Sequence, residues 1–444
     1  MKRAILDKLL SWKNKPSRKP LLIDGARQTG KTYLLQELLG QNFNNVIRID
    51  FLEEPQFREA FSNSLNPDDI ITNIELLTGE VFDLATDLLI LDEIGECPKA
   101  VTALKFFAEK APQAYIAASG SNIGLLTSFP VGKVEKHNLR PLTFKEFLWA
   151  SEEKPIIKAF EQKMMNSEVA HKKLFDMLTD YYFVGGMPEA VAAWFDQSDR
   201  SIIERTTLVS DVQSNLIQGY LRDFGKYSDK VDATLIESVF TSIPSQLSSV
   251  FDDSVKRFKF KGVHQRKSRY AEYESAITWL HKCRLALKNY PIDGQPRSPL
   301  SAYQKENAIK LFLFDVGLLN HMLATSYREV KQQGYEYKGY VAENFVQQEL
   351  TALGYDPTFS WGDARAEIEF VIADDLGRIV PIEVKSGKRT RAKSLQSYIT
   401  KCKPHKTIKL TGTRGSSALE QEHIVMPLYY TQYLNDHLTD RAEV

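Results

Sequence analysis

The segment GARQTGKT, residues 25–32, has the residue types and the spacing of a loop that binds phosphate. Its glycines let backbone N–H groups close around phosphate oxygens. In such a loop the lysine reaches the β- and γ-phosphates, and the threonine places its hydroxyl on Mg2+. A glycine-containing turn with an exposed lysine is the alternative. We expect ATP and Mg2+ to be bound by Gly25, Ala26, Arg27, Gln28, Thr29, Gly30, Lys31 and Thr32.

Two carboxylates end the apolar segment DLLILDE, residues 87–93. An acid at the end of such a strand coordinates Mg2+ through water, and the next glutamate can polarise the attacking water. We assign Asp92 to the metal and Glu93 to the water, which predicts hydrolysis of ATP with Lys31 as the second catalytic residue. A solvated loop start or a helix cap is the alternative for the two acids.

Short apolar segments predict the strands that position these residues. The helix-forming segments between them predict a parallel sheet with helices on both faces, an α/β fold. Ligands bind beyond the carboxyl ends of such strands, so Ser119 or Ser121 is placed to sense the γ-phosphate. Capping of the next helix is the equal alternative for these serines. The expected strands are residues 21–24, 45–51, 87–93 and 115–121.

A second group of acidic residues lies near the C-terminus. Alternating apolar and polar residues predict two strands around a turn at 374–378. If residues 373 and 379 pair across that turn, Glu369 lies directly opposite Glu383, about 5 Å away at Cβ. Two carboxylates at this distance repel each other unless a cation or a proton lies between them.

Glu343 lies on the apolar stripe of a helix predicted over 340–350, where a carboxylate is costly without a partner. With Glu369, Glu383 and Lys385 it completes the catalytic set of a PD-(D/E)XK nuclease. Such a site holds Mg2+ between the strand acids, here Glu369 and Glu383, while the lysine orients water or steadies the phosphate. The strand acid is usually Asp, and the longer Glu369 alters the metal geometry. The alternative is a hairpin with a cross-strand Glu/Lys pair on a solvated face.

Lys plus Arg and Asp plus Glu number 57 each, so nucleic-acid affinity has to come from local patches. The segment KRFKFKGVHQRKSR, residues 256–269, holds seven Lys or Arg and no acid, which makes it the candidate contact for DNA. A solvated stretch whose phenylalanines pack inward is the alternative. Further positive charge follows the C-terminal acids at Lys388, Arg389, Arg391 and Lys393.

The remaining composition indicates a cytoplasmic protein. The three cysteines lie far apart, without metal-like spacing or an even-numbered disulfide framework, which indicates a reducing compartment. No run of about 18 apolar residues is present, so no membrane span is expected. Residues 1–20 carry acidic and polar residues where a signal peptide needs an apolar run, and their spacing predicts a short amphipathic helix.

The chain resembles a large prokaryotic family of AAA-type P-loop ATPases with a C-terminal domain of unassigned function that carries nuclease-like motifs. The resemblance implies a cytosolic ATP hydrolase whose biological role is poorly defined. In AAA-type enzymes a neighbouring subunit often contributes an arginine to the ATP site, so the resemblance is compatible with an oligomer. The matching segments are GARQTGKT, LLILDE, ASGSN, LRPLTFKEF (139–147), GGMPE (185–189), IPSQLSS (243–249), LFLFDVGLL (311–319) and PIEVKSG (381–387).

One position departs from the family pattern. The family usually shows Gly-Arg before the PL-F-EF segment, whereas this chain has Gly132-Lys133. Lysine keeps the charge but lacks the planar fork that grips phosphate bidentately. An arginine-finger role at this position is therefore not expected.

These features predict four domains and a function that couples them. The first candidate is an ATPase coupled to nucleic-acid binding or processing through the nuclease-like domain. The second is a signalling or switch ATPase whose C-terminal domain binds a partner and has lost its chemistry. A small-molecule kinase would need a substrate site that no segment indicates. The predicted domains are a P-loop AAA-type ATPase domain (1–150), a helical lid (151–230), a winged-helix-like segment (231–300) and a PD-(D/E)XK nuclease-like domain (301–444).

Overall fold

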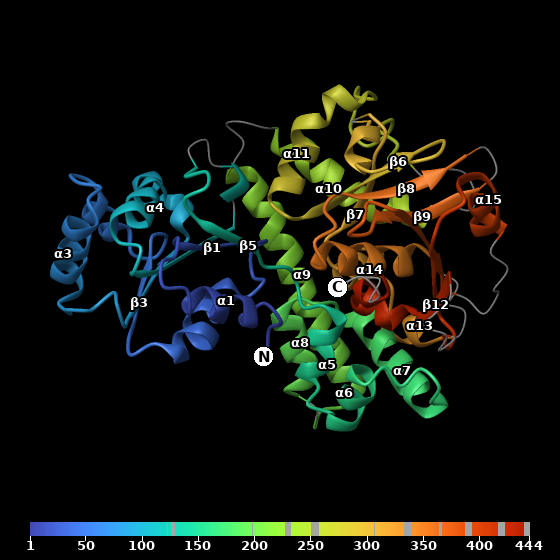
Figure 1. Ribbon diagram of the computed structural model, residues 1–444, viewed down its shortest axis with the longest axis horizontal. Coiled ribbons are helices and arrows are strands. Elements are labelled where there is room, and N and C mark those ends of the chain that lie inside the picture. The colour runs from blue at the N-terminus through green and yellow to red at the C-terminus, as the bar shows by residue number, and fades with distance from the viewer. Residues whose placement is uncertain are drawn as a thin grey trace. The chain divides into compact units, whose positions relative to one another are not determined.

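The computed structural model of the chain forms two compact units. The N-terminal unit comprises Met1–Arg140 with Lys282–Arg284, and the second unit comprises Pro141–His281 with Leu285–Val444 (Figure 1). The described residues are 1–121, 123–125, 129–197, 199–226, 232–249, 257–305, 307–332, 339–363, 366–386, 393–415 and 422–438.

A parallel sheet forms the centre of the N-terminal unit, as predicted. Its strands follow the order β2-β3-β4-β1-β5 in the described part of the chain. The strand β5 was not predicted, because its sequence EKHN has no apolar residue, yet it pairs in parallel with β1. The strands are β1 (Leu21–Asp24), β2 (Val46–Asp50), β3 (Leu88–Asp92), β4 (Tyr115–Gly120) and β5 (Glu135–Asn138).

Helices cover both faces of this sheet because successive strand residues point to opposite faces. Ile49 and Leu91 pack with α3 and α4, whereas Ile23 and Ile90 pack with α1 and η1. The amphipathic helix predicted at the N-terminus is α1. The helical elements of this unit are α1 (Leu6–Lys13), α2 (Lys31–Tyr33), η1 (Leu34–Leu39), η2 (Gly40–Asn42), η3 (Pro55–Phe61), α3 (Pro67–Thr78), η4 (Ile94–Glu96), α4 (Pro98–Lys110) and η5 (Ile123–Leu125).

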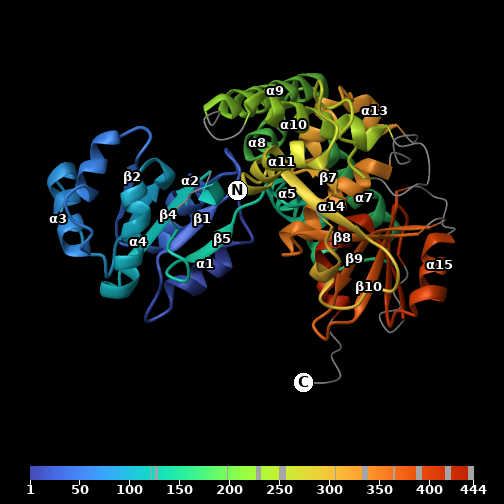
Figure 2. The same cartoon turned by 90° about the horizontal axis from the view of Figure 1, so that it is seen from above.

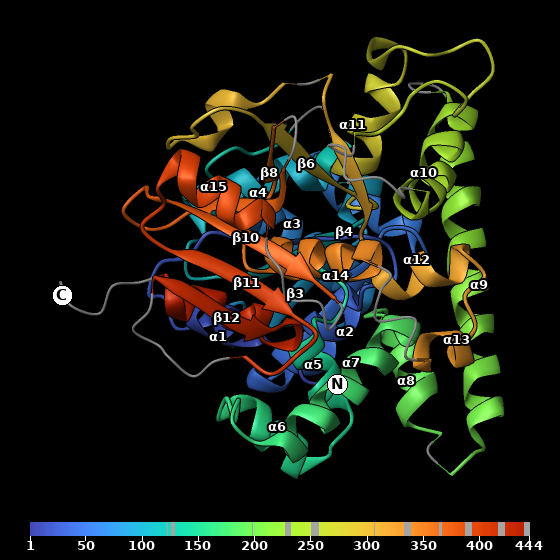
Figure 3. The ribbon, with the colours of Figure 1, turned by 90° about the vertical axis from the view of Figure 1, so that its right-hand side faces the viewer.

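A mixed sheet forms the centre of the second unit, and Figure 3 shows its strands β10, β11 and β12 side by side. Its strands follow the order β12-β11-β10-β9-β8-β6-β7 among the described residues. Residue 373 pairs with residue 379, so the register predicted for β9 and β10 is confirmed. The strands are β6 (Ala286–Ile292), β7 (Lys310–Leu313), β8 (Thr358–Gly362), β9 (Glu367–Ala373), β10 (Ile379–Lys385), β11 (Thr407–Thr411) and β12 (His423–Pro427).

The helices α14 and α15 lie on opposite sides of this sheet (Figure 2). From residue 339 onward, one helix is followed by three strands, a second helix and a further strand, in the order α14-β8-β9-β10-α15-β11. The strand β6, predicted as part of a winged-helix-like segment, pairs here with β7 and β8. The helical elements are α5 (Phe144–Ala150), α6 (Lys154–Glu161), α7 (Glu168–Val184), α8 (Pro188–Phe195), α9 (Ile202–Lys226), α10 (Ala233–Ser248), η6 (Tyr270–Glu272), α11 (Glu274–Lys282), η7 (Leu300–Tyr303), α12 (Val316–Met322), α13 (Tyr327–Lys331), α14 (Gly339–Ala352), α15 (Lys393–Cys402) and η9 (Leu428–His437).

Within the described ranges, no helix combines the length and the apolar character needed to cross a membrane.

Buried hydrogen bonds anchor the segment that opens the second unit. The Leu142 amide donates to the Gly186 carbonyl at 2.6 Å, and the Tyr181 hydroxyl donates to the Leu142 carbonyl. A Cβ at residue 186 would lie 2.1 Å from that carbonyl oxygen, so only glycine fits. The Phe144 amide donates to the buried Glu349 carboxyl at 3.0 Å. The segments LRPLTFKEF and GGMPE therefore meet in one packed joint.

Two buried carboxyl groups belong to this joint. Asp315 accepts hydrogen bonds from the Gly186 amide at 2.7 Å and the Leu318 amide at 3.0 Å. Burial raises the pKa of Asp315 to about 6 and the pKa of Glu349 to about 8. Both groups therefore carry a proton more readily here than in water.

The pKa of Glu349 predicts a specific pH dependence of stability. Because the folded pKa of about 8 exceeds the ordinary value of 4.5, Glu349 stabilises the fold fully below pH 4.5, and this contribution is lost as pH rises through 8. The variant Glu349→Gln keeps an acceptor for the Phe144 amide. Between pH 4.5 and pH 8 we expect its unfolding free energy to fall less than that of wild type, and the difference should be on the order of a few kcal/mol. Urea denaturation at a series of pH values measures the difference. Glu153→Gln, at an exposed position, is the control, and equal slopes for Glu349→Gln and wild type would contradict the assignment.

Candidate nucleotide-binding site

The predicted phosphate loop joins the end of β1 at Asp24 to the start of α2. Its backbone requires glycine at two positions. Gly30 has φ 88°, in the left-handed region, and a Cβ at Gly25 would lie 2.4 Å from the Leu139 carbonyl oxygen. Gln28 also has a positive φ of 62°. The loop therefore adopts the tight conformation in which backbone N–H groups can surround an anion.

Side chains hold this loop in place. The Thr29 hydroxyl donates to the Ala26 carbonyl at 2.8 Å, and the buried Arg3 guanidinium donates to the Thr29 carbonyl at 2.9 Å. Ala26 and Thr29 are buried, Arg27 is half-buried and Gln28 is exposed. The loop is thus fixed from within the N-terminal unit.

The Lys31 ammonium folds back over this loop. Its Nζ donates to the carbonyls of Gly25 at 3.2 Å and Ala26 at 3.0 Å. Burial lowers the pKa of Lys31, although the carboxylates of Glu93 and Asp92 oppose this effect. The two carbonyl oxygens receive the hydrogen bonds that phosphate oxygens of a bound nucleotide would receive.

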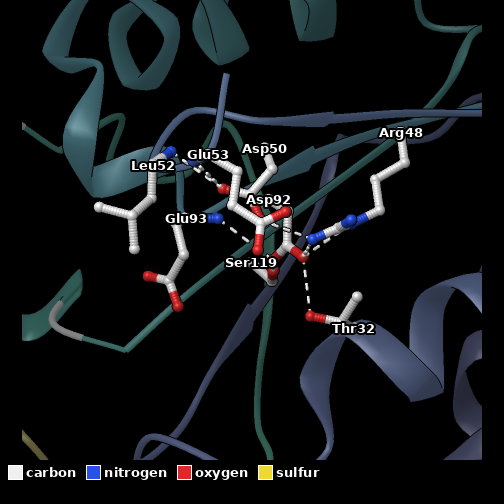
Figure 4. Close-up of polar contacts among 8 residues, drawn as sticks. All are labelled: Thr32, Arg48, Asp50, Leu52, Glu53, Asp92, Glu93 and Ser119. Carbon is white, nitrogen blue, oxygen red and sulfur yellow. Dashed lines mark hydrogen bonds and ion pairs between the residues drawn. The ribbon is translucent and has the colours of Figure 1, made fainter. Parts of the chain in front are cut away.

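The Asp92 carboxylate is the centre of the site (Figure 4). Its Oδ2 accepts from the Thr32 hydroxyl at 2.7 Å and from Arg48 Nε at 3.0 Å. Its Oδ1 accepts from the Glu93 amide at 3.1 Å and from the Ser119 hydroxyl. Burial opposes ionisation, but the Ser119 and Thr32 hydroxyls and the Arg48 charge hold the pKa of Asp92 below its ordinary value. Asp92 is therefore ionised and fixed.

Glu93 adopts a strained backbone conformation with φ 46°, which a non-glycine residue rarely takes. Its Oε2 accepts from the Ser121 hydroxyl at 3.3 Å. Burial and the nearby Asp92 raise the pKa of Glu93, and Lys31 opposes them. The two serines at the end of β4 thus donate to the two acids, Ser119 to Asp92 and Ser121 to Glu93.

Arg48 was not among the residues predicted for this site. Arg48 and Asp50 point to the same side of β2, and Asp50 pairs in register with Asp92 on β3. Two charged residues at alternate positions of an otherwise apolar strand are the signal that could have identified them. Lys133, at the position where the family has arginine, forms an ion pair with Glu109 at 2.8 Å.

The oxygen groups at this site suit a hydrated Mg2+ ion. A hydroxyl and a carboxylate, from Thr32 and Asp92, lie within hydrogen-bond distance of each other beside the phosphate loop. Mg2+ prefers such oxygen ligands and usually keeps several waters. The residues present therefore fit the predicted ion.

The C-terminal acids lie in a second cluster, within the second unit. Lys385 Nζ lies 3.4 Å from Glu369 and 3.3 Å from Glu383. The Val384 amide donates to Glu369 at 2.9 Å. The contact between Lys385 and Glu369 is the cross-strand pair that the alternative expects, but the side chains of Glu369 and Glu383 are only 11% and 0% exposed, so these two acids do not lie on a solvated face.

Burial sets the protonation of this cluster. It raises the pKa of Glu369 and that of Glu383, although Lys385 opposes the increase in both. Burial also disfavours the Lys385 ammonium, but the two glutamates together raise the pKa of Lys385. The helix acid Glu343 forms a buried ion pair with Lys310 at 2.5 Å. In the described part of the chain, no group of three or more His, Cys, Asp or Glu side chains is arranged to hold a metal ion.

The basic segment predicted to contact DNA is described from residue 257. Arg257, Lys259 and Lys261 are exposed, whereas Phe258 is buried and Phe260 packs against Tyr273. The phenylalanines thus pack inward, as the alternative interpretation expects. Lys393 is exposed at the start of α15. Residues 256, 388, 389 and 391 lie outside the described residues.

Comparisons with known proteins give a described family for the N-terminal part of the chain and domains of unknown function for the rest of the matched residues. Residues 17–148 match a family described as an AAA domain, residues 175–329 a domain of unknown function (DUF8612) and residues 338–431 a domain of unknown function (DUF4143). No curated protein matches the chain. A solved structure, described as "Structure of Drosophila ORC bound to DNA", is 14% identical over 72% of this chain and 84% of that chain, with a TM-score of 0.27. The AAA match and the phosphate loop together support an ATP-binding ATPase domain of the AAA type in residues 17–148.

Proposed function

We propose that this protein binds ATP with Mg2+ at residues 25–32 and hydrolyses it, and that hydrolysis is coupled to nucleic-acid binding or processing by the second unit. The contact between the Thr32 hydroxyl and the Asp92 carboxylate, 2.7 Å long, carries the first part of this proposal. It links the phosphate loop to the acids at the end of β3. When bound there, Mg2+ would draw charge from the phosphate oxygens.

Lys31 and Glu93 have different roles in the proposed hydrolysis. Lys31 would exchange its two carbonyl partners for β- and γ-phosphate oxygens. Glu93 would orient a water and accept its proton as the water oxygen bonds to the γ-phosphorus. The bond from that phosphorus to the bridging oxygen breaks, which leaves ADP and phosphate. A raised pKa makes Glu93 a better proton acceptor than an ordinary glutamate.

Replacement of the proposed base separates binding from hydrolysis. In Glu93→Gln we expect the rate of ATP hydrolysis to fall by about 100-fold or more, because the amide cannot accept the proton. Binding of a fluorescent ATP analogue should persist. Phosphate release measures the first and fluorescence titration the second. Glu96→Gln, at a glutamate that is 45% exposed on η4, is the matched control. Hydrolysis by Glu93→Gln at the wild-type rate would contradict the role.

The loop lysine tests the binding site itself. In Lys31→Ala we expect the ATP analogue to bind roughly 10- to 100-fold more weakly, because charge-assisted hydrogen bonds to the phosphates are lost. Circular dichroism should show an intact fold. Lys8→Ala, at an exposed lysine of α1, should bind as wild type does. If Lys31→Ala bound the analogue as tightly as wild type, the assignment of the nucleotide site to residues 25–32 would be contradicted.

The placement of the motif residues supports the proposal of a nuclease-like domain in the second unit. The helix α14, which carries Glu343, precedes the β9–β10 hairpin, and Glu369, Glu383 and Lys385 lie together on that hairpin. We propose that this domain contacts nucleic acid and cleaves it at these residues.

A specific observation favours a second candidate, a domain that binds a partner without cleaving nucleic acid. Lys310 and Glu343 are 6% and 8% exposed and pair at 2.5 Å, so the helix acid already has a cation as its partner. Breaking such a buried pair typically costs about 3–5 kcal/mol. A metal ion that used Glu343 would have to overcome this cost.

A cleavage assay distinguishes the two candidates. With Mg2+ or Mn2+, ATP and plasmid or single-stranded DNA, we expect cleavage by the wild type and at least about 100-fold slower cleavage by Lys385→Ala, because water and phosphate lose their cation. Lys172→Ala, at an exposed lysine of α7, is the control. Cleavage that persists in Lys385→Ala would contradict the site assignment. Absence of both cleavage and DNA-stimulated ATP hydrolysis in the wild type would favour the partner-binding domain.

A further inference from the structure

Among the described residues, four hydrogen-bond donors saturate the Asp92 carboxylate. Oδ2 accepts from the Thr32 hydroxyl and Arg48 Nε, and Oδ1 accepts from the Glu93 amide and the Ser119 hydroxyl. A carboxylate offers about four lone-pair positions. A water on a Mg2+ ion that Asp92 helped to hold would therefore have to replace one of these donors.

The geometry identifies Arg48 as the donor that leaves. The Glu93 amide belongs to the backbone beside Asp92, and Ser119 is fully buried on β4. The Thr32 hydroxyl can continue to donate its hydrogen bond to Asp92 while a lone pair of its oxygen faces a metal ion. Arg48 alone among the four donors carries a full positive charge, and its side chain is 29% exposed.

Asp50 gives Arg48 a second partner when it leaves Asp92. Its Oδ2 lies 2.5 Å from the Arg48 guanidinium (Figure 4). Its Oδ1 accepts from the Leu52 amide at 2.9 Å and the Glu53 amide at 3.1 Å, so backbone groups fix this carboxylate. Arg48 can therefore release Asp92 and remain paired with Asp50.

We propose that Arg48 is a built-in counter-ion that competes with Mg2+ for Asp92. Without nucleotide, its guanidinium balances the charge of Asp92. With Mg2+ and ATP bound, Asp92 would help to hold the ion, and Arg48 would release Asp92 and stay paired with Asp50. The strength of the Arg48–Asp92 contact thus sets the Mg2+ concentration that the site requires. This inference rests on the proposed binding of ATP and Mg2+.

A Mg2+ titration of nucleotide binding tests this role. With a fixed concentration of a fluorescent, non-hydrolysable ATP analogue, Mg2+ is added to each variant and the midpoint of the fluorescence change is recorded. We expect Arg48→Gln to need roughly tenfold less Mg2+ than wild type, because a competing charge is gone. Without nucleotide and Mg2+, its melting temperature should be lower than that of wild type, since Asp92 then lacks its counter-ion.

Further variants separate competition from a loss of structure. Arg48→Lys, which keeps the charge, should need nearly as much Mg2+ as wild type. Asp50→Asn weakens the alternative partner of Arg48, so it should need more Mg2+ than wild type. Arg58→Gln, at an arginine of η3 that is 42% exposed, is the control.

The outcomes distinguish this inference from the proposed function. If wild type binds the analogue in a Lys31-dependent manner but Arg48→Gln has the same or a higher Mg2+ midpoint, the counter-ion role is overturned and ATP binding stands. If wild type binds no analogue with or without Mg2+, both are overturned. A lower midpoint in Arg48→Gln together with a higher one in Asp50→Asn supports the competition.

Discussion

The hydrogen bond from the Thr32 hydroxyl to the Asp92 carboxylate joins the phosphate loop to the end of β3, and the rest of the site is arranged around it. Arg48 reaches this carboxylate from β2 and Ser119 reaches it from β4. These contacts exist because β2, β3, β4 and β1 are adjacent and parallel, so their carboxyl ends meet at one edge. A buried, ionised carboxylate with four donors makes this edge rigid, and its negative charge is balanced by Arg48.

Local sequence patterns predicted the parts of this site that depend on neighbours in the chain. The phosphate loop, the acids that end β3 and the β9–β10 hairpin register all follow from residues close in sequence. The alternating charges of β2 could have indicated Arg48 as a candidate, but its contact with Asp92 arises only when β2 pairs with β3. For the same reason Lys310 could not be recognised as the partner of Glu343, which lies on a different element of the second unit. The winged-helix-like segment was predicted from a helix followed by an extended apolar segment, and the pairing of that segment, β6, with β7 and β8 involves residues outside the predicted bounds.

Some of the motifs that carry the family resemblance have a structural role. Leu142, Gly186 and Asp315 come from three of these motifs and meet in the buried joint of the second unit. The close approach of Leu142 to residue 186 excludes any side chain there, and the buried carboxyl of Asp315 satisfies backbone amides. From sequence alone, such segments cannot be told from catalytic ones, because both combine glycines with isolated acids.

The most direct test of the central claim is a crystal structure of the protein with Mg2+ and a non-hydrolysable ATP analogue. We predict that the β- and γ-phosphates lie within residues 25–32 and that Lys31 has left the carbonyls of Gly25 and Ala26. We also expect Mg2+ to lie about 2.1 Å from the Thr32 hydroxyl oxygen. A nucleotide bound elsewhere, or a metal ion away from both Thr32 and Asp92, would contradict the proposed site.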